Sequence, residues 1–264
     1  MGRIGDKFES LRRKKEKALI VYLTAGDPSL SVTKKLIFGL EKAGVDILEI
    51  GVPFSDPTAD GPVIQAASQR ALKAGTTLQG VLNLVAEVRK VSEIPIVLFG
   101  YFNPIFAYGV QKFAGAARRA GIDGVLVVDL PYEEAKELRV YTDAVGIDFI
   151  SLIAPTTDGK RLSKIAARAS GFLYYISITG ITGTAAPKID HIKTAVKKIC
   201  KITKLPIAVG FGISKPQQAR EIARFADGIV IGSAVVSLIN ENKNNPDLVG
   251  IVSNYASEIK NALQ

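Results

Sequence analysis

Short runs of apolar, mostly β-branched residues recur along the chain at a spacing of roughly 30 residues, the length of one strand–helix unit. The runs are nearly continuous and do not alternate with polar residues, which is typical of parallel strands covered on both faces. We therefore predict eight parallel strands, over residues 19–23, 46–50, 95–99, 124–128, 148–152, 172–176, 206–209 and 227–231.

The segments between these runs have the apolar spacing of amphipathic helices, as residues 30–42 and 189–201 illustrate. Eight strand–helix units in about 250 residues predict an α/β protein with the (β/α)8 architecture of a TIM barrel. A doubly wound sheet is disfavoured, because the first predicted strand runs into Thr24-Ala25-Gly26-Asp27-Pro28 and not into a GxGxxG turn.

Several segments lie outside the eight units. We predict an extra N-terminal helix over residues 2–15 that closes the N-terminal end of the barrel, and added helices around strands 2 and 8, one of them over residues 77–90. Residues 102–108 are expected to form an aromatic loop and residues 177–188 a loop rich in Gly, Thr and Ala. Because no low-complexity linker interrupts the pattern, residues 1–264 are predicted to form a single domain.

Composition restricts the class of protein. Of the 264 residues, 47% are hydrophobic and 22% are charged, which is the balance of a folded globular protein. No apolar run approaches the ~18 residues that cross a bilayer, and the N-terminus lacks the core of a signal peptide, so we expect a cytoplasmic protein without a membrane partner. The net charge of +9 is spread along the chain without interleaved aromatic residues, which favours steering of anions over binding of nucleic acid.

Cys200 is the only cysteine and His191 is the only histidine. An intrachain disulfide and a metal cage built from cysteines or histidines are therefore excluded, and we predict no metal site. We expect His191 on an exposed helix face and Cys200 in the core of a helix.

The second predicted strand carries the first candidate catalytic residue. Alternation places Glu49 on the face opposite Leu48 and Ile50, so that it points into the mouth of the barrel. Burial raises the pKa of a carboxyl group, which makes a glutamate usable as a general acid or base near neutral pH. The alternative is a structural glutamate that satisfies polar groups of a neighbouring strand.

The loop after this strand, residues 53–62, contains three prolines and two further carboxylates. Asp60 is a candidate for catalysis, or alternatively the cap of a helix that begins at Val63. Asp56 is a second candidate, or alternatively a residue of an Asx turn.

Glycines in the last third of the chain predict an anion site. The last two predicted strands end in Gly210-Phe211-Gly212 and Gly232-Ser233, and each is followed by a helical pattern. Glycine lets backbone N–H groups approach a ligand, a helix N-terminus favours an anion, and many barrels bind phosphate here. Thr182 and Gly183 would form a third wall, and turn glycines without a ligand are the alternative. A flat apolar ligand would fit at the same mouth, unless these side chains serve only barrel packing: Tyr22, Phe99, Tyr101, Leu126, Tyr174 and Phe211.

Residues 48–62, LEIGVPFSDPTADGP, resemble the signature of the tryptophan synthase α subunit family. This loop is highly specific, whereas glycine motifs alone would fit many phosphate-binding barrels. Further matches follow in the expected order over nearly the whole chain: Thr24-Ala25-Gly26-Asp27-Pro28, Tyr101-Phe102-Asn103-Pro104-Ile105, Asp129-Leu130-Pro131, Gly180-Ile181-Thr182-Gly183 and Gly210-Phe211-Gly212-Ile213-Ser214.

The resemblance implies a lyase of tryptophan biosynthesis that cleaves 1-C-(indol-3-yl)glycerol 3-phosphate to indole and D-glyceraldehyde 3-phosphate in a retro-aldol reaction. By similarity, Glu49 is the proton shuttle and Asp60 accepts a hydrogen bond from the indole N–H. The phosphate group would be held by Gly183, Gly212, Gly232 and Ser233. The indole pocket would contain Tyr22, Ile64, Phe99, Tyr101, Leu126, Tyr174, Thr182 and Phe211. Tyr22 and Phe99 depart from the family pattern, in which Phe and a smaller apolar residue are common at these positions.

The resemblance also implies an αββα heterotetramer, in which indole passes through a tunnel to the pyridoxal phosphate of the β subunit. This chain itself is then expected to bind no cofactor. The expected interface residues are Pro53, Phe54, Asp56, Pro57, Asn103, Phe106 and Pro131. An exposed Phe54 would anchor the partner, or alternatively pack within its own turn. Residues 178–187 are expected to act as a mobile lid over the substrate.

Three other functions compete with this one. A stand-alone indole-3-glycerol-phosphate lyase would perform the same chemistry and release indole freely. A catalytically weak α-like protein would serve mainly as an allosteric partner, which the presence of Glu49 and Asp60 disfavours. Another phosphate-binding barrel, such as a sugar-phosphate isomerase, is disfavoured by the loop of residues 53–62.

Overall fold

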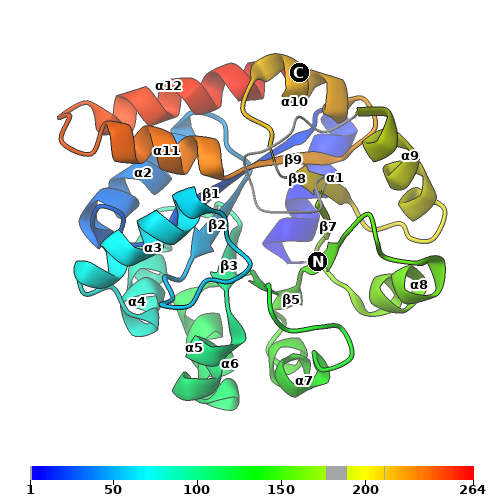
Figure 1. Ribbon diagram of the computed structural model, residues 1–264, viewed down its shortest axis with the longest axis horizontal. Helices are drawn as coiled ribbons and strands as arrows, with labels where there is room; N and C mark the ends of the chain where they lie inside the picture. Colours follow the sequence, from blue (N-terminus) through cyan, green and yellow to red (C-terminus); the bar gives the residue numbers. More distant parts are fainter. Residues whose placement is uncertain (1, 177–188, 211) are drawn as a thin grey trace.

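Parallel strands form the centre of the structure and helices surround them (Figure 1). The computed structural model describes residues 2–176, 189–210 and 212–264. In these ranges the strands are β1 (Ala18–Thr24), β2 (Ile47–Gly51), β3 (Ile96–Gly100), β4 (Gly124–Val127), β5 (Asp148–Phe149), β6 (Ser151–Ile153), β7 (Leu173–Ile176), β8 (Ile207–Gly210) and β9 (Gly228–Ile231).

These strands form one parallel sheet in the order β5-β4-β3-β2-β1-β9-β8-β7-β6. β5 pairs with β4 and β6 pairs with β7, while only Ile150 separates β5 from β6 along the chain. The sheet therefore returns to its own edge, and the predicted TIM barrel is confirmed. One correction concerns the fifth predicted strand, residues 148–152. It is split because the Ile150 N–H still bonds the Val125 carbonyl of β4, whereas Ser151 already pairs with Leu173 of β7.

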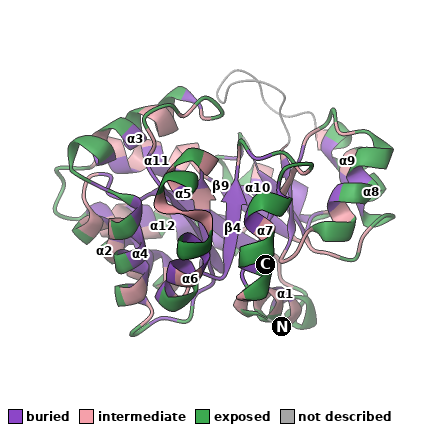
Figure 2. Cartoon of the chain, turned by 90° about the horizontal axis from the view of Figure 1, so that it is seen from below, coloured by how far each residue is buried: buried purple, intermediate pink, exposed green. Residues whose placement is uncertain are grey.

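Helices cover the outside of the barrel, and one helix lies at its lower end in the side view (Figure 2). The helices in the described ranges are α1 (Arg3–Lys14), α2 (Leu30–Lys42), α3 (Pro62–Lys73), α4 (Leu78–Val88), α5 (Phe102–Tyr108), α6 (Val110–Ala120), α7 (Lys136–Ala144), α8 (Gly159–Arg168), α9 (Ile189–Cys200), α10 (Pro216–Ala223), α11 (Ser233–Glu241) and α12 (Leu248–Asn261). The predicted additions are confirmed, since α1 precedes the barrel, α3 and α4 both lie between β2 and β3, and α11 and α12 follow β9.

The prediction of a loop over residues 102–108 is wrong, because these residues form the helix α5. Pro104 stands in its first turn, where the missing N–H has no helical partner to lose. Gly109 ends the helix with a positive φ of 92°. Seven residues make only two turns, which is too short for a helical periodicity to show in the sequence.

The alternation along each strand divides the apolar side chains between two layers. Leu48 and Ile50 face outward and belong to the cluster that packs against the surrounding helices. Ile20 and Ile47 face inward and form the barrel core together with α1, whose Phe8 ring lies 5.7 Å from the ring of Phe172. α1 therefore closes the end of the barrel that is opposite the carboxyl ends of the strands.

Ile4 of α1 provides a stability prediction. This side chain is fully buried, and its Cδ1 occupies the space over Gly124, where a Cβ would lie only 3.0 Å away. Ile4→Val removes that methyl group and is expected to lower the free energy of unfolding by about 1 kcal/mol in urea denaturation. The same substitution at Ile202, which is 41% exposed, is the control and is expected to stay within about 0.5 kcal/mol. Equal effects at both positions would contradict a buried α1.

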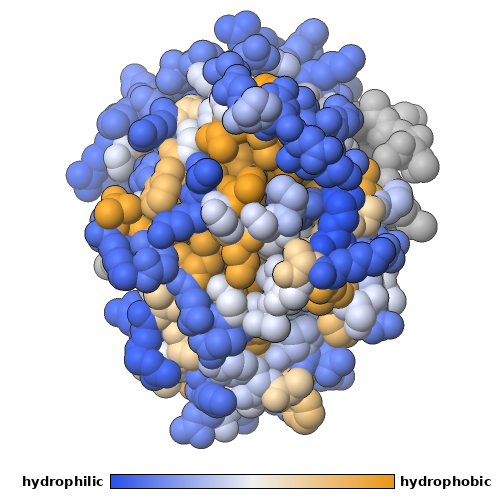
Figure 3. All heavy atoms as spheres, turned by 90° about the vertical axis from the view of Figure 1, so that its left-hand side faces the viewer, coloured by the Kyte–Doolittle hydropathy of each residue, from blue (hydrophilic) through white to orange (hydrophobic). Residues whose placement is uncertain are grey.

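The outer surface is mostly hydrophilic in the view of Figure 3, with apolar side chains gathered near its middle. His191 is exposed on α9 as predicted, whereas Cys200 is exposed and not in a helix core, because it is the last residue of α9 and turns away from the apolar stripe. In the part of the chain that the structure describes, no helix is long and apolar enough to cross a membrane. No group of three or more His, Cys, Asp or Glu residues that could hold a metal ion occurs in the same part.

Candidate active site

Glu49 lies inside the barrel near the carboxyl end of β2. Its register partner on β1 is Tyr22 and its partner on β3 is Val97, so the three side chains point to the same face of the sheet. Glu49 is 1% exposed, and its Oε1 has no hydrogen-bond partner among the residues that the structure describes. Desolvation by burial raises the pKa of the Glu49 carboxyl from 4.5 to about 8. Among the described residues, Glu49 Oε1 therefore does not satisfy a polar group of a neighbouring strand, which is what the structural alternative required.

The Asp60 side chain is held in place by Tyr101. The Tyr101 hydroxyl donates to Asp60 Oδ2 at 3.0 Å and accepts the Ala59 N–H at 3.0 Å. The Gln65 side chain donates to the Asp60 carbonyl oxygen at 2.8 Å. Burial raises the pKa of Asp60 from 3.8 to about 6, and the hydrogen bond from Tyr101 opposes that rise. An aspartate with this pKa is ionised at neutral pH.

The alternative that Asp60 caps the following helix is wrong. α3 begins at Pro62 and its N-cap is Gly61, which makes no side-chain cap hydrogen bond. Proline suits this first helical position because its φ is already helical and it lacks the N–H that would stay unpaired. The Asp60 side chain is thereby left free to face the cavity.

Both carboxylates line one cavity of about 280 Å³ at the carboxyl ends of the strands. Among the residues that the structure describes, its lining has no Lys or Arg and is mostly apolar. It consists of Tyr22, Glu49, Ala59, Asp60, Gly61, Val63, Ile64, Phe99, Tyr174, Gly212, Ile213, Ser214, Val230, Gly232, Ser233, Ala234 and Ser237. A flat apolar ligand of modest size fits such a lining.

One wall of this cavity is suited to an anion. α11 begins at Ser233, directly after Gly232, and no side chain caps its first turn. Its free N–H groups and the positive end of its dipole therefore face the cavity. Gly212 lies on the same wall with a φ of +78°, a backbone conformation that other residues rarely adopt. An anionic group would be held here by backbone amides and not by a cationic side chain.

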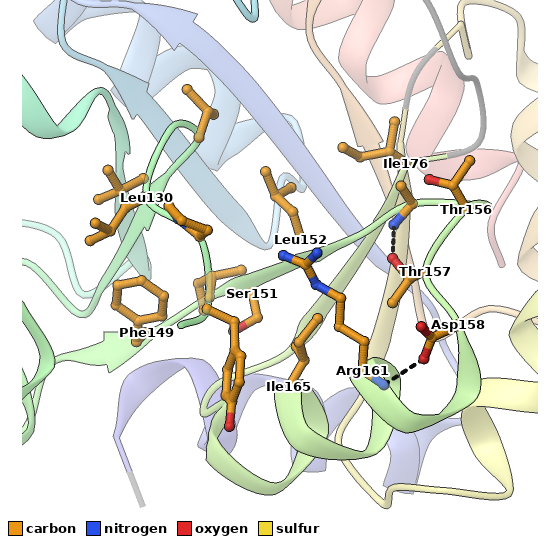
Figure 4. Close-up of a pocket in the computed structure, with 16 residues that line it drawn as sticks. Leu130, Phe149, Ser151, Leu152, Thr156, Thr157, Asp158, Arg161, Ile165 and Ile176 are labelled. Carbon is orange, nitrogen blue, oxygen red and sulfur yellow. Dashed lines mark hydrogen bonds between the residues drawn. The ribbon is translucent and has the colours of Figure 1, made fainter. Parts of the chain in front are cut away.

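A second cavity of about 360 Å³ lies between the end of β4, the split fifth strand and α8 (Figure 4). Its two charged lining residues already have partners. Asp158 accepts the N–H of Arg161 as the N-cap of α8, and the Arg161 side chain pairs with Glu133. Among the described residues that line this cavity, Asp158 is the one carboxylate and it already caps a helix, whereas the first cavity is lined by two carboxylates.

Most of the predicted ligand residues line the first cavity. These are Tyr22, Ile64, Phe99, Tyr174, Gly212, Gly232 and Ser233, together with both predicted acids. Two are placed elsewhere. Tyr101 is hydrogen-bonded to Asp60 but does not line the cavity itself. Leu126 is fully buried in the barrel core. Thr182, Gly183, Phe211 and the lid of residues 178–187 lie outside the described residues.

The cavity also contains residues that the sequence analysis did not single out. Val63 on α3 and Ala234 and Ser237 on α11 belong to its lining. Residues 62–73 and 233–241 have ordinary amphipathic patterns, so only the packing of these helices across the barrel mouth brings them to the site.

The residues predicted for a partner interface lie on loops and helices at the same end of the barrel. Asp56, Asn103, Phe106 and Pro131 are exposed, and Phe106 is 59% exposed. The expectation of an exposed Phe54 is wrong in part, because its ring is half-buried and lies 5.3 Å from the ring of Tyr101. Pro57 is also half-buried, and Pro53 is buried at the end of β2 and is not accessible to a partner.

Comparisons with known proteins agree with this geometry. A family model described as tryptophan synthase alpha chain matches residues 8–264. The tryptophan synthase alpha chain of Citrifermentans bemidjiense is 50% identical over 260 residues, which cover 98% of this chain and 97% of that protein. The crystal structure of tryptophan synthase subunit alpha from Legionella pneumophila superposes with a TM-score of 0.93 at 40% identity, and the match covers 100% of this chain and 98% of that one.

A further structure is similar over nearly the same length. The match to a chain in the crystal structure of the tryptophan synthase complex from Pyrococcus furiosus has a TM-score of 0.84 at 36% identity, and it covers 92% of this chain and 98% of that one. The sequence matches and the structural matches thus both extend over nearly the whole chain. The chain belongs to the tryptophan synthase alpha chain family, the lyases that catalyse the α reaction of tryptophan biosynthesis.

Proposed function

We propose that Glu49 and Asp60 perform the retro-aldol cleavage of 1-C-(indol-3-yl)glycerol 3-phosphate to indole and D-glyceraldehyde 3-phosphate in this chain. One observation supports the assignment above all. Two carboxyl groups with raised pKa values lie on one side of an apolar cavity, and the uncapped N-terminus of α11 lies on another. The indole ring would occupy the apolar part, and the phosphate group would bind Gly212, Gly232 and Ser233.

The reaction requires two proton transfers. The protonated Glu49 carboxyl donates a proton to C3 of the indole ring, and the ring then accepts the electrons of the breaking C–C bond. The resulting Glu49 carboxylate takes the proton of the glycerol hydroxyl as the aldehyde forms, so that Glu49 ends in its starting state. Positive charge develops on the indole N–H during the first step, and the Asp60 carboxylate stabilises it.

These roles predict a bell-shaped dependence of kcat/KM on pH. Asp60 is ionised above its raised pKa of about 6, and Glu49 keeps its proton below its raised pKa of about 8. We expect maximal kcat/KM near pH 7, with a fall toward tenfold per pH unit beyond each limb. Indole release measured from pH 5 to pH 9 checks this. A profile that stays flat across this range would contradict the assigned protonation states.

No cofactor is needed in this chain for the proposed chemistry, because the protonated indole ring itself accepts the electron pair. Pyridoxal phosphate would belong to a β-subunit partner, in keeping with the resemblance. We also propose that residues 1–264 act as a single domain, since one sheet joins strands from both halves of the chain. A cytoplasmic location stays a prediction.

We propose in addition that the chain binds a tryptophan synthase β subunit in an αββα assembly, through the exposed residues near the cavity mouth. The similarity to a chain of the Pyrococcus furiosus complex supports a partner of this kind. Phe106→Ala on α5 is expected to weaken β-subunit binding by about tenfold in isothermal titration calorimetry, since an exposed aromatic ring is a typical interface anchor. The matched control is Val91→Ala, which is 77% exposed at the opposite end of the barrel. Equal affinities for both variants would contradict this surface.

Indole release by the purified chain, measured with and without the β subunit, tests the proposed function. Release that rises on addition of the β subunit supports an assembly with channelling. Activity that does not respond to the β subunit would favour the stand-alone lyase. Failure to release indole under both conditions would contradict the proposed roles of Glu49 and Asp60.

A further inference from the structure

Tyr22 carries a hydroxyl group into the cavity that the two acids line. Its ring is held by three elements, since it packs with Ala67 of α3, Val236 of α11 and Phe99 of β3. The ring of Phe99 lies 5.1 Å away in an edge-on arrangement. With its ring fixed in this way, the hydroxyl group has one defined position.

Two neighbours on β1 and β2 determine where this hydroxyl lies. A Cβ on Gly51 would be only 2.1 Å from the Tyr22 hydroxyl oxygen, so the hydroxyl occupies the space that the missing side chain leaves. Thr24, the register partner of Gly51, donates its own hydroxyl proton to the Tyr22 oxygen at 3.3 Å. Gly51 leaves room for the Tyr22 hydroxyl group. The Tyr22 hydroxyl oxygen already accepts a hydrogen bond from Thr24.

The hydroxyl proton of Tyr22 is therefore available for a hydrogen bond to an acceptor inside the cavity. Within the described ranges, no hydrogen bond of the structure uses this proton, and none uses Oδ1 of Asp60, whose Oδ2 accepts from Tyr101. The other titratable groups that line this space are Glu49 on β2, Asp60 after β2 and Tyr174 on β7. Tyr101, which holds Asp60 Oδ2, lies outside the lining. Burial is the main cause that raises the pKa of the Tyr22 hydroxyl. The negative charges of Asp60 and, to a smaller extent, of Glu49 raise it further.

We propose that Tyr22 is a positioning residue for the lyase reaction, which donates its hydroxyl proton to the Asp60 carboxylate when the substrate occupies the cavity. With Tyr101 on one carboxylate oxygen and Tyr22 on the other, Asp60 is oriented toward the indole N–H and stays ionised. This inference rests on the role proposed for Asp60 above.

The test compares Tyr22→Phe with Thr24→Val and with Tyr175→Phe. Tyr175 is a buried tyrosine of the same barrel that faces the outer helix layer, so its variant controls for the loss of one buried hydroxyl. We expect Tyr22→Phe to lower kcat/KM at pH 7 by about tenfold, with KM changed by less than about threefold, because the ring that contacts the indole remains. Tyr175→Phe is expected to match the unmodified protein.

The pH dependence separates positioning from packing. Loss of a donor to a carboxylate raises its pKa, so the acid limb of kcat, which reports the enzyme–substrate complex, is expected to move up by about one pH unit in Tyr22→Phe and by less in Thr24→Val. The pKa of Asp60 in the protein with glycerol phosphate bound, measured by 13C NMR of its carboxyl carbon, is expected to move in the same direction.

Two results would overturn the inference. One is an acid limb and an Asp60 titration in Tyr22→Phe that coincide with those of Tyr175→Phe. The other is a lower kcat in Tyr22→Phe with the acid limb unmoved, which would make Tyr22 a packing residue. The NMR titration does not depend on turnover, so it decides on the Tyr22–Asp60 hydrogen bond even if the role proposed for Asp60 in the reaction fails.

Discussion

Glu49→Gln is expected to lower kcat for indole release by about 10²–10⁴-fold, while the affinity for the substrate changes little. The amide has nearly the shape of the carboxyl group, so the apolar cavity and its anion wall are retained. It can neither give a proton to C3 of the indole ring nor take one from the glycerol hydroxyl. Steady-state kinetics of indole release, with substrate binding measured separately by calorimetry, checks both parts of this expectation.

Stability measurements show whether this loss reflects chemistry or unfolding. Folding raises the pKa of Glu49 from 4.5 to about 8, so in this pH window the folded state holds a proton that the unfolded state has released. The free energy of unfolding therefore falls as pH rises through the window, and the uncharged amide of the Glu49→Gln variant escapes this penalty. Glu49→Gln is expected to be more stable than the unmodified protein at pH 8 by a few kcal/mol, and to differ little at pH 4.

Glu137→Gln is the matched control, since Glu137 is exposed on α7 away from the cavity. It is expected to leave both activity and stability unchanged. Near-normal indole release by Glu49→Gln would contradict the assignment of Glu49 as the proton shuttle.

Asp60→Asn is expected to lower kcat by about 10²-fold, because the indole N–H loses the negative charge that faces it in the transition state. The asparagine retains an oxygen that can accept the hydrogen bond from Tyr101, so the loop is expected to keep its conformation. The acid limb of the pH profile should also disappear, since the group that titrates at about pH 6 has been removed. Kinetics from pH 5 to pH 9 measures both effects.

Asp143→Asn, which alters an exposed carboxylate on α7 that pairs with Arg139, serves as the control for a general loss of negative charge. It should retain the full pH profile. An acid limb that persists in Asp60→Asn would assign that limb to another group and contradict the role of Asp60.

The residues that local patterns singled out mostly line one cavity. Glu49 was placed inside the barrel because alternation along five residues decides which face a side chain occupies. Leu126 shows where this reasoning stops, since an inward-facing residue can lie either in the barrel core or at its mouth. The height of a residue along the barrel axis depends on strand register, which no local pattern reports.

The exposure of loop residues likewise depends on neighbours that are distant in sequence. Phe54 was expected to be exposed because it stands in a polar, proline-rich segment. The ring is instead half-buried on Tyr101, which is distant in sequence and becomes a neighbour only because β2 and β3 are adjacent strands.

The sequence by itself determined the repeated strand–helix unit, the inward direction of Glu49 and the glycines before α11, because each depends on neighbours within about one turn or one strand. The count of eight such units predicted a barrel. The tertiary structure decided the properties that make these residues a site. Only the closed barrel leaves Glu49 Oε1 without a partner among the described residues, brings the Tyr101 hydroxyl to Asp60 across 41 residues, and places the Tyr22 hydroxyl over Gly51. Burial and hydrogen bonding between strands set the pKa values of the two acids, and these are properties of the packed interior.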